Sequence, residues 1–325
     1  MSLFVSFGEI MLRLSPPAMQ QIQNANSFDA CYGGSEANVL ACLSALGNKT
    51  AYLTALPATA LGDATVKHLK ACGVDTSHII RKGDNMGMYF LEQGFGTRSS
   101  QVIYNRKNSE VTRLDANSFD FDKIFEGCTH FHICGISFAL SKSSCELAFA
   151  LLQNAKQRGI KTSFDFNYRA KLWSTEQAAP VYRKIIPFVD ILFCSSLDLS
   201  TFLGTDIEHF YSNYSTELLI VREREIISSA EHSAKAAIYR QNGLDAECVA
   251  TNSASFDVLD RIGSGDAFVG GVLHSLYNNP QSLTAALQTG MACFVLKHTL
   301  PGDTFTLNYA AVQAHIDNHS KDVSR

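Results

Sequence analysis

Two glycines beside an acidic residue form the strongest chemical signal in the chain. The segment Asp260-Arg-Ile-Gly-Ser-Gly-Asp266 leads into an apolar stretch rich in small residues, 267–276, which is typical of a buried helix. Glycines at a helix start let several backbone N–H groups point at one spot, where the helix dipole also favours negative charge. A helix cap alone would explain Asp266, whereas phosphoryl transfer needs a base near the acceptor hydroxyl and fixed donors around the phosphate. Both could come from Gly263, Ser264, Gly265 and Asp266, which we take as candidate catalytic residues.

A second glycine pair precedes another predicted helix, in Gly33-Gly34-Ser35-Glu36-Ala37-Asn38. One interpretation is a tight turn followed by a helix cap. The other is backbone contact with a small polar ligand, to which Asn38 would offer a directed amide. The local pattern leaves both open.

Two arginines follow predicted strands. Arg106 comes after Tyr104 at the end of a hairpin, and Arg169 follows Asp165 and Asn167 at the end of a buried strand. Guanidinium groups bind carboxylate or phosphate in a bidentate manner. Open α/β sheets bind ligands at the carboxyl edge of their strands, which favours a ligand role for the pair over surface ion pairs.

The elements that must position these residues alternate between strand and helix. Apolar runs predict strands at 3–7, 51–56, 129–133, 161–165 and 191–194, and 3.6-residue periodicity predicts helices at 35–46, 64–72 and 144–157. This alternation indicates a mainly parallel sheet with helices on both faces. Residues 86–106 look like an inserted hairpin, which is an edge decoration or a lid. Between 205 and 255 only strands at 218–221 and 236–239 are predicted.

Composition excludes several classes of protein. The chain has 325 residues, 46% of them apolar and 18% charged, with 27 basic and 31 acidic residues and a net charge of −4. These values are typical of a folded globular chain and disfavour nucleic-acid binding. Nine dispersed cysteines suit a reducing cytosol. With neither a signal-peptide core nor an 18-residue apolar run, we expect a cytoplasmic protein without a membrane span.

Together these motifs resemble the ribokinase-like sugar kinases of the PfkB family over nearly the whole chain. The order of Gly8-Glu9, Gly33-Gly34 to Asn38, Leu61-Gly62-Asp63, Gly73-Val74 and Gly263-Ser-Gly-Asp266 follows family sequence. Three segments are most similar to the 2-keto-3-deoxygluconate kinases of that family: Tyr104-Asn-Arg106, Asp165-Phe-Asn-Tyr-Arg169 with Leu172-Trp173, and Asp260-Arg-Ile-Gly263.

The resemblance implies a fold and a reaction. It implies a single α/β domain over 1–325, a three-layer αβα sandwich with a small β lid formed from parts of 10–32 and 86–113. ATP with Mg²⁺ would be the phosphoryl donor, and Asp266 would remove the proton from the C6 hydroxyl of 2-keto-3-deoxygluconate. The amides of Gly263 to Asp266 would hold the developing phosphoryl charge, giving 2-keto-3-deoxy-6-phosphogluconate.

Further site residues carry over by position. Residues matching substrate contacts are Gly33, Gly34, Asn38, Tyr89, Tyr104, Arg106, Arg169, Asp266 and Asp303. Residues matching nucleotide contacts are Asn167, Arg169, Ser195, Arg222, Gly263 and Gly265, and Asp198 matches a metal-site carboxylate. Because the implied substrate is a carboxylate, which fructose and ribose are not, Arg106 would select it through a charge-assisted pair.

Two departures from the family pattern and two alternatives remain. The stretch Ile220-Val-Arg-Glu-Arg-Glu-Ile226 has no glycine where many members have a glycine-containing nucleotide loop, and Ser195-x-x-Asp198 replaces an Asn-x-x-Glu motif.

One alternative is a kinase for fructose, 5-keto-2-deoxygluconate or a related ketose, and the other is a catalytically silent sugar-binding regulator. The sequence leaves open the substrate epimer and any monovalent-cation dependence. The exposed strand edges of the lid favour a homo-oligomer.

Overall fold

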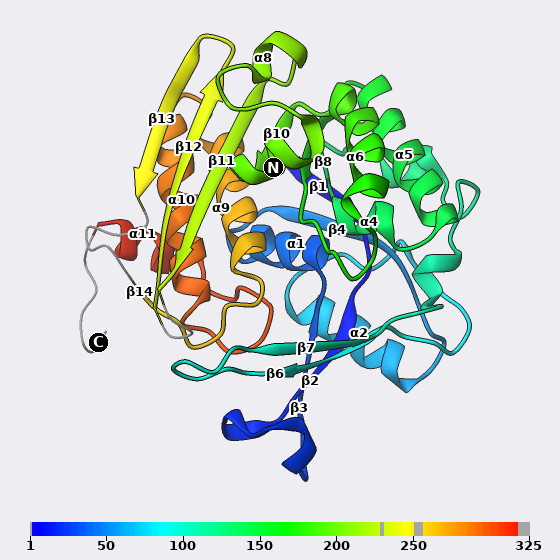
Figure 1. Cartoon of the computed structure of the whole chain (residues 1–325). Helices are drawn as coiled ribbons and strands as arrows, with labels where there is room; N and C mark the ends of the chain where they lie inside the picture. Colours follow the sequence, from blue (N-terminus) through cyan, green and yellow to red (C-terminus); the bar gives the residue numbers. More distant parts are fainter. Residues whose placement is uncertain (1, 228–230, 250–255, 318–325) are drawn as a thin grey trace.

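A long, mostly parallel sheet forms the centre of the molecule. The computed structural model describes residues 2–227, 231–249 and 256–317, and within them ten strands join this sheet (Figure 1). In spatial order they are β13 (Gly243–Val249), β12 (Glu231–Arg240), β11 (Leu218–Ile226), β10 (Ile191–Cys194), β9 (Lys161–Asp165), β8 (His130–Cys134), β1 (Leu3–Phe7), β4 (Lys49–Leu56) and β5 (Ile79–Arg81), with β14 (Phe256–Asp257) paired to β12. All pairs from β11 to β5 are parallel, and β12 and β13 add an antiparallel edge.

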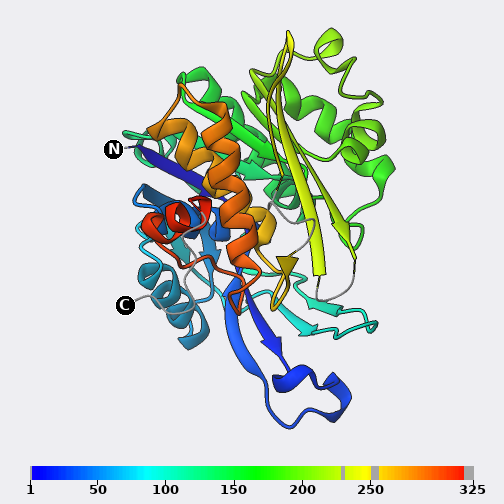
Figure 2. The same cartoon turned by 90° about the vertical axis from the view of Figure 1, so that its left-hand side faces the viewer.

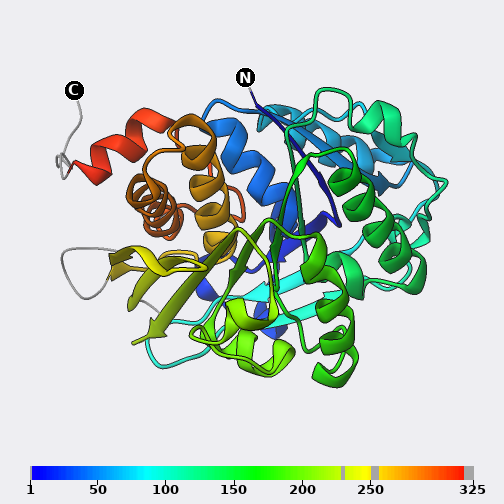
Figure 3. The ribbon, with the colours of Figure 1, turned by 90° about the horizontal axis from the view of Figure 1, so that it is seen from above.

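Helices cover both faces of this sheet, because its central strands are apolar on both sides. One face packs on α1 (Ser35–Ala45), α2 (Ala60–Ala71), α9 (Ser264–Asn278) and α10 (Leu283–Lys297). The other packs on α3 (Phe121–Ile124), α4 (Gly135–Ala139), α5 (Lys142–Gln157) and α6 (Thr175–Ile185). Seen from above, the sheet runs between these two sets of helices (Figure 3). Shorter helices are α7 (Ser196–Asp198), α8 (Phe210–Asn213) and α11 (Tyr309–Ile316).

A second, smaller sheet projects from the main body (Figures 1 and 2). Within the described residues it has four strands in the order β3 (Asp29–Gly33), β2 (Met11–Ser15), β6 (Met88–Glu92) and β7 (Gln101–Asn105). We call these four strands the lid. Side chains alternate between faces along each strand, and Met11, Tyr89 and Leu91 form a small apolar cluster that packs against Ile262 of the main body.

The predicted three-layer α/β sandwich with a small separate sheet is confirmed. Strands β1, β9 and β10 have the predicted bounds, and α1 and α5 end near Gly47 and Gly159, both at positive φ as helix-terminating glycines require. The prediction was incomplete between 205 and 255, where β11 and β12 run well past the expected ends.

The prediction that residues 220–226 form a nucleotide-binding loop is wrong. These residues belong to strand β11, which pairs with β12 from Leu219 opposite Tyr239 to Ile226 opposite His232. Arg222 to Glu225 are all charged, so the segment lacks the apolar residues by which a strand is recognised in sequence. Its backbone N–H and C=O groups form cross-strand hydrogen bonds, whereas in a loop they would be left to solvent.

Candidate functional site

One cavity of about 730 Å³ lies at the carboxyl edge of the main sheet, where the lid meets the body. Every residue that the sequence marked as a candidate lines it. They are Gly33, Gly34, Asn38, Tyr89, Tyr104, Arg106, Asn167, Arg169, Ser195, Asp198, Arg222, Gly263, Ser264, Gly265, Asp266 and Asp303. Residues separated by more than 200 positions therefore meet at one place, as ligand-binding residues of open α/β sheets do.

Asp266 lies in the first turn of α9. Gly263 is the N-cap of this helix at φ 79°, a left-handed conformation that glycine adopts without strain. Asp266 caps no helix end: its two carboxylate oxygens accept hydrogen bonds from Ser35 Oγ (2.8 Å) and Asn38 Nδ2 (2.8 Å) of α1. Asn167 Nδ2 in turn donates to Ser35 Oγ (2.6 Å). Three elements thus fix the orientation of the carboxylate.

The surroundings of Asp266 shift its pKa in two opposing ways. Burial raises the pKa of Asp266 above its usual value, and the hydrogen bonds from Asn38 and Ser35 lower it in part. At the start of α9, Ser264 N donates to the carbonyl of Arg261 (3.3 Å) and Ala267 N to that of Gly263 (2.9 Å). The N–H groups of Gly265 and Asp266, between them, have no partner within the helix and lie at its positive dipole end. A carboxylate with a raised pKa beside such donors could accept a proton from a hydroxyl group, and the donors could stabilise an anion.

Arg106 enters the cavity from the end of β7 but is already paired. Its Nε lies 2.7 Å from Glu9 Oε2 and its Nη2 contacts the same oxygen, while Ser109 Oγ donates to the other oxygen of Glu9. Both members of the pair are buried. The pair uses the Nε and Nη2 groups of Arg106 and fixes the plane of its guanidinium.

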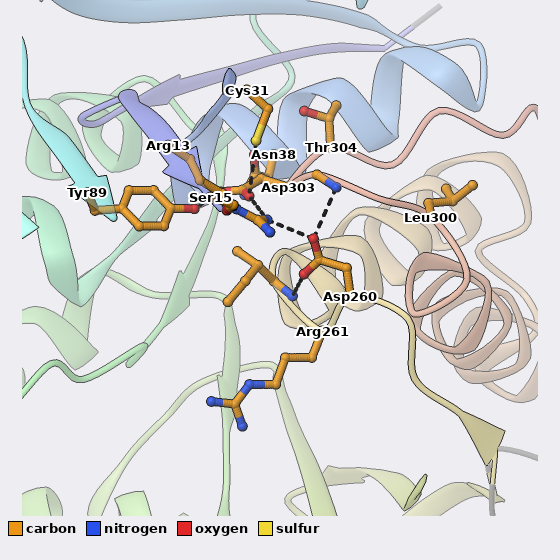
Figure 4. Close-up of polar contacts among 12 residues, drawn as sticks. Arg13, Ser15, Cys31, Asn38, Tyr89, Asp260, Arg261, Leu300, Asp303 and Thr304 are labelled. Carbon is orange, nitrogen blue, oxygen red and sulfur yellow. Dashed lines mark hydrogen bonds and ion pairs between the residues drawn. The ribbon is translucent and has the colours of Figure 1, made fainter. Parts of the chain in front are cut away.

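Asp303 joins the lid to the main body (Figure 4). One of its oxygens accepts from Arg13 Nη1 (2.8 Å) and the other from the Tyr89 hydroxyl. The same Nη1 lies 2.8 Å from Asp260 Oδ2, and Arg13 Nε donates to Ser15 Oγ (2.9 Å). Arg13, Asp260 and Asp303 are each under 5% exposed.

The opposite part of the cavity contains a second charged group. The Arg222 guanidinium lies over the rings of Phe268 (5.3 Å) and Phe294 (4.7 Å), next to Gly265. Burial raises the pKa of Asp165 to about 7, with Asp266 and Asp198 adding to the shift and Arg222 opposing it. Asp198 Oδ2 accepts from Ser195 N (2.8 Å) and Ser195 Oγ (2.7 Å), a capping box at the start of α7.

Comparison with known proteins decides the family. Residues 1–307 match the model of the pfkB family carbohydrate kinases. The chain belongs to this family. This PfkB kinase is 34% identical to the 2-dehydro-3-deoxygalactonokinase of Haloferax volcanii over 307 residues, which are 92% of each chain.

Solved structures agree with this PfkB assignment. The crystal structure of 2-dehydro-3-deoxygluconokinase from Thermotoga maritima matches with a TM-score of 0.92 and 32% identity, over 97% of this chain and 98% of that one. A putative ribokinase II from E. coli, in complex with ATP and Mg²⁺, shares the fold with a TM-score of 0.84 at 22% identity, over 98% of this chain and all of that one. Relatives of this kind make the chain an enzyme, a sugar-acid kinase, and favour that interpretation over the silent regulator considered from sequence.

Three residues of the PfkB site were missed in the sequence. Ser35 was seen only as part of a glycine motif, although its hydroxyl contacts Asp266. Glu9 was seen only as part of the Gly8-Glu9 motif, and Arg13 was not marked as a site residue. A charged residue between leucines in an alternating strand, as in Leu12-Arg13-Leu14, is the signal that could have identified Arg13, because such a position is buried and its charge needs partners. Within the described residues no helix has the length and apolarity to cross a membrane.

Proposed function

We propose that this kinase transfers the γ-phosphoryl group of ATP to the C6 hydroxyl of 2-keto-3-deoxygluconate, with Asp266 as general base. The observation that carries the proposal is the position of Asp266, held by Ser35 and Asn38 at the N-terminus of α9 in a cavity that also contains Arg106 and Arg169. The activities for which the Haloferax volcanii and Thermotoga maritima relatives are named support the substrate class.

Asp266 would act on the acceptor hydroxyl. The hydroxyl donates to the carboxylate, which takes the proton as the oxygen attacks phosphorus. Asn38 and Ser35 hold the carboxylate in position, so little reorganisation is needed when the substrate arrives. Because burial raises the pKa of Asp266, the carboxylate accepts a proton more readily than an exposed aspartate does.

The start of α9 would stabilise the transferring phosphoryl group. The N–H groups of Gly263 to Asp266 and the positive end of the helix dipole favour the charge that spreads over its oxygens. Arg222, next to Gly265, adds a full positive charge on the nucleotide side. Ser195, Asn167 and Arg222 are the residues we assign to the nucleotide.

Arg106 and Arg169 would recognise the carboxylate of the sugar acid. Arg106 lies on the lid and Arg169 follows β9 in the main body, so a ligand bound by both spans the cavity mouth. The backbone at Gly33 and Gly34, the hydroxyls of Tyr89 and Tyr104, and Asp303 would contact the rest of the acceptor. A neutral ketose lacks the group that pairs with the arginines, which supports a sugar acid over fructose.

The Mg²⁺ that accompanies ATP would be held mainly by phosphate and water oxygens. The part of the chain that the structure describes has no group of three histidine, cysteine or carboxylate side chains able to hold a metal. Asp198 offers a single carboxylate, with one oxygen used in the capping box, and this fits an ion that commonly keeps several waters and binds through substrate phosphates. When bound, Mg²⁺ would neutralise phosphate charge.

An ADP-release assay tests the proposal. The panel would contain 2-keto-3-deoxygluconate, its galactonate-derived epimer, 5-keto-2-deoxygluconate, fructose and ribose, each with ATP and Mg²⁺. We expect the 2-keto-3-deoxy acids to have the highest kcat/KM, and D266N to lower kcat about 10²- to 10⁴-fold. D206N, which changes an exposed aspartate paired with His209, is the matched control and should act as wild type. Turnover of fructose or ribose alone would disprove the assigned substrate.

A further inference from the structure

A single lid residue, Arg13, contacts two carboxylates, Asp260 and Asp303, that lie next to the loop preceding α9. Its Nη1 lies 2.8 Å from an oxygen of Asp260 and 2.8 Å from an oxygen of Asp303, and all three side chains are buried (Figure 4). Asp260 begins the loop that contains Gly263, and Asp303 lies in a loop that follows α10. Arg13 is therefore the contact through which a lid strand touches both loops.

The two carboxylates control the backbone around Gly263. Asp260 Oδ1 accepts from Ile262 N (3.1 Å), and Asp260 Oδ2 accepts from Gly302 N (3.1 Å), so this one side chain ties the two loops together. The carbonyl oxygen of Asp303 lies so close to Gly263 that a Cβ added there would be 1.9 Å from it. Movement of either aspartate would consequently move the N-cap of α9.

The lid presents Arg13 in a fixed row of side chains. Across the sheet Arg13 pairs with Cys31 of β3 and with Tyr89 of β6, and Tyr89 pairs with Tyr104 of β7. Side chains at paired positions lie on the same face. The hydroxyl of Tyr89 donates to the Asp303 oxygen that Arg13 does not bind. Side chains from two neighbouring lid strands, Arg13 of β2 and Tyr89 of β6, thus both bind the carboxylate of Asp303.

Arg13 is the cation that pairs directly with both carboxylates. Lys297 is also fully buried, donates to the carbonyl of Leu300 (3.0 Å), and has its pKa lowered by burial and raised in part by Asp260 and Asp303. Loss of Arg13 alone would leave an unbalanced negative charge beside the phosphate-binding amides, where it would repel the transferring group.

We propose that Arg13 is a positioning residue for phosphoryl transfer, which holds Asp260 and Asp303 so that the Gly263–Asp266 amides form a competent phosphate site only with the lid in place. This inference rests on the proposed function, since it assigns those amides to the phosphoryl group. A displacement of about 1 Å at such a site can lower a rate about 100-fold.

Steady-state kinetics of R13M, R13K and R98M test the proposal. Arg98 is the matched control, because it also forms a lid ion pair, with Glu92 (3.0 Å), but its ion pair involves neither Asp260 nor Asp303. We expect kcat to fall about 100-fold in R13M, with a smaller change in the KM of the sugar, and at least 10-fold in R13K, whose ammonium is a point charge instead of a fork. R98M should keep kcat within threefold of wild type. Equal kcat losses in R13M and R98M, or a kcat in R13M within threefold of wild type, would overturn the proposal.

A double variant separates positioning from folding. R13Q/D260N removes one cation and one carboxylate, so the net charge of the buried group is unchanged, and thermal unfolding should show stability closer to wild type than that of R13M. If Arg13 acts by positioning, kcat in the double variant stays below that of D260N alone; a kcat equal to that of D260N, together with recovered stability, would mean that Arg13 serves folding only. The comparison uses whichever acceptor the wild type phosphorylates best. A wrong substrate assignment therefore appears in the wild-type panel, separately from any failure of the Arg13 proposal.

Discussion

The side-chain amide of Asn38 donates to the carboxylate of Asp266 over 2.8 Å, although 228 positions separate the two residues. Asn38 lies in the first turn of α1 and Asp266 in the first turn of α9, and these two helices pack side by side on the same face of the sheet. The two glycine motifs that were separate signals in the sequence are therefore one site. Each helix contributes its N-terminus to it.

Replacing Asn38 should move the pH dependence of the reaction. Asn38 lowers the pKa of Asp266, so in N38A that pKa rises and the base is protonated up to a higher pH. We expect the acidic limb of the kcat/KM profile to shift to higher pH and kcat to fall about 10- to 100-fold, since one of two positioning hydrogen bonds is lost. The control is N48A, which removes a buried amide that donates to Leu43 O (2.9 Å) outside the cavity. An acidic limb that is the same in N38A and N48A would contradict this role.

Removal of Arg106 should reduce discrimination between acidic and neutral sugars. In R106Q we expect kcat/KM for the sugar acid to fall about 10- to 100-fold, the effect of losing a charge-assisted hydrogen bond, and kcat/KM for fructose to change less than threefold. The single variant leaves Glu9 buried without its cation and should also unfold at lower temperature. E9Q/R106Q restores neutrality and separates the two effects. An equal loss for acid and neutral sugars would exclude Arg106 as the residue that reads the carboxylate.

Local patterns were enough to predict the central part of the fold. Strands β1, β9 and β10 are buried apolar runs bounded by turn residues, and their ends coincide with the prediction because burial on both faces leaves a continuous signal. Strand β11 was truncated in the prediction. Its second half alternates arginine and glutamate, and only pairing with β12 makes that segment a strand.

The residues of the candidate site could be predicted from the sequence, but the ion pairs between them could not. Motif order marked Asp266, Asn38 and Arg106, and all three line one cavity. The ion pairs in and around the site were not predictable, because Glu9 meets Arg106 and Arg13 meets Asp303 only through the packing of the lid on the body. Contacts between residues so far apart in sequence leave no periodic signal in a single chain.

Gly263 should be essential for activity because of its close contact with Asp303 as well as its left-handed backbone angle. Gly263 (φ 79°) and Gly47 (φ 96°) are both left-handed, and an alanine in that conformation costs about 1–2 kcal/mol. A Cβ at Gly263 would lie 1.9 Å from the Asp303 carbonyl oxygen, whereas a Cβ at Gly47 meets nothing within 4 Å. We expect G47A to lower the free energy of unfolding by about 1–2 kcal/mol with kcat unchanged, and G263A to lose kcat at least 100-fold. Equal kcat values in G263A and G47A would show that the loop adjusts freely.

Two buried histidines should make the protein less stable as the pH falls below neutrality. His130 Nε2 and His132 Nδ1 both hydrogen-bond Ser163 Oγ, at 2.7 and 2.8 Å, and His130 Nδ1 shares a 2.8 Å hydrogen bond with the Tyr277 hydroxyl. Burial lowers the pKa of both imidazoles to about 3 in the folded protein, and for His130 the neighbouring His132 adds to the shift. The unfolded chain takes up these protons near pH 6.5, so the stabilisation is complete above pH 6.5 and is lost as the pH falls from there toward 3.

The variant H132N tests this dependence in denaturant titrations at pH 8, 6.5 and 5. Asparagine can keep a hydrogen bond to Ser163 but has no proton to gain, so the decline in unfolding free energy below pH 6.5 should be shallower than in wild type by about 1.4 kcal/mol per pH unit. The control is H209N, whose parent side chain is 69% exposed and paired with Asp206, and its decline should match wild type. Because H132N changes no carboxylate or carboxylate partner, the contribution of the carboxylates cancels in its comparison with wild type. If the unfolding free energy of H132N and wild type declined with the same slope below pH 6.5, His132 would take up its proton equally in the folded and unfolded protein, and the prediction would be wrong.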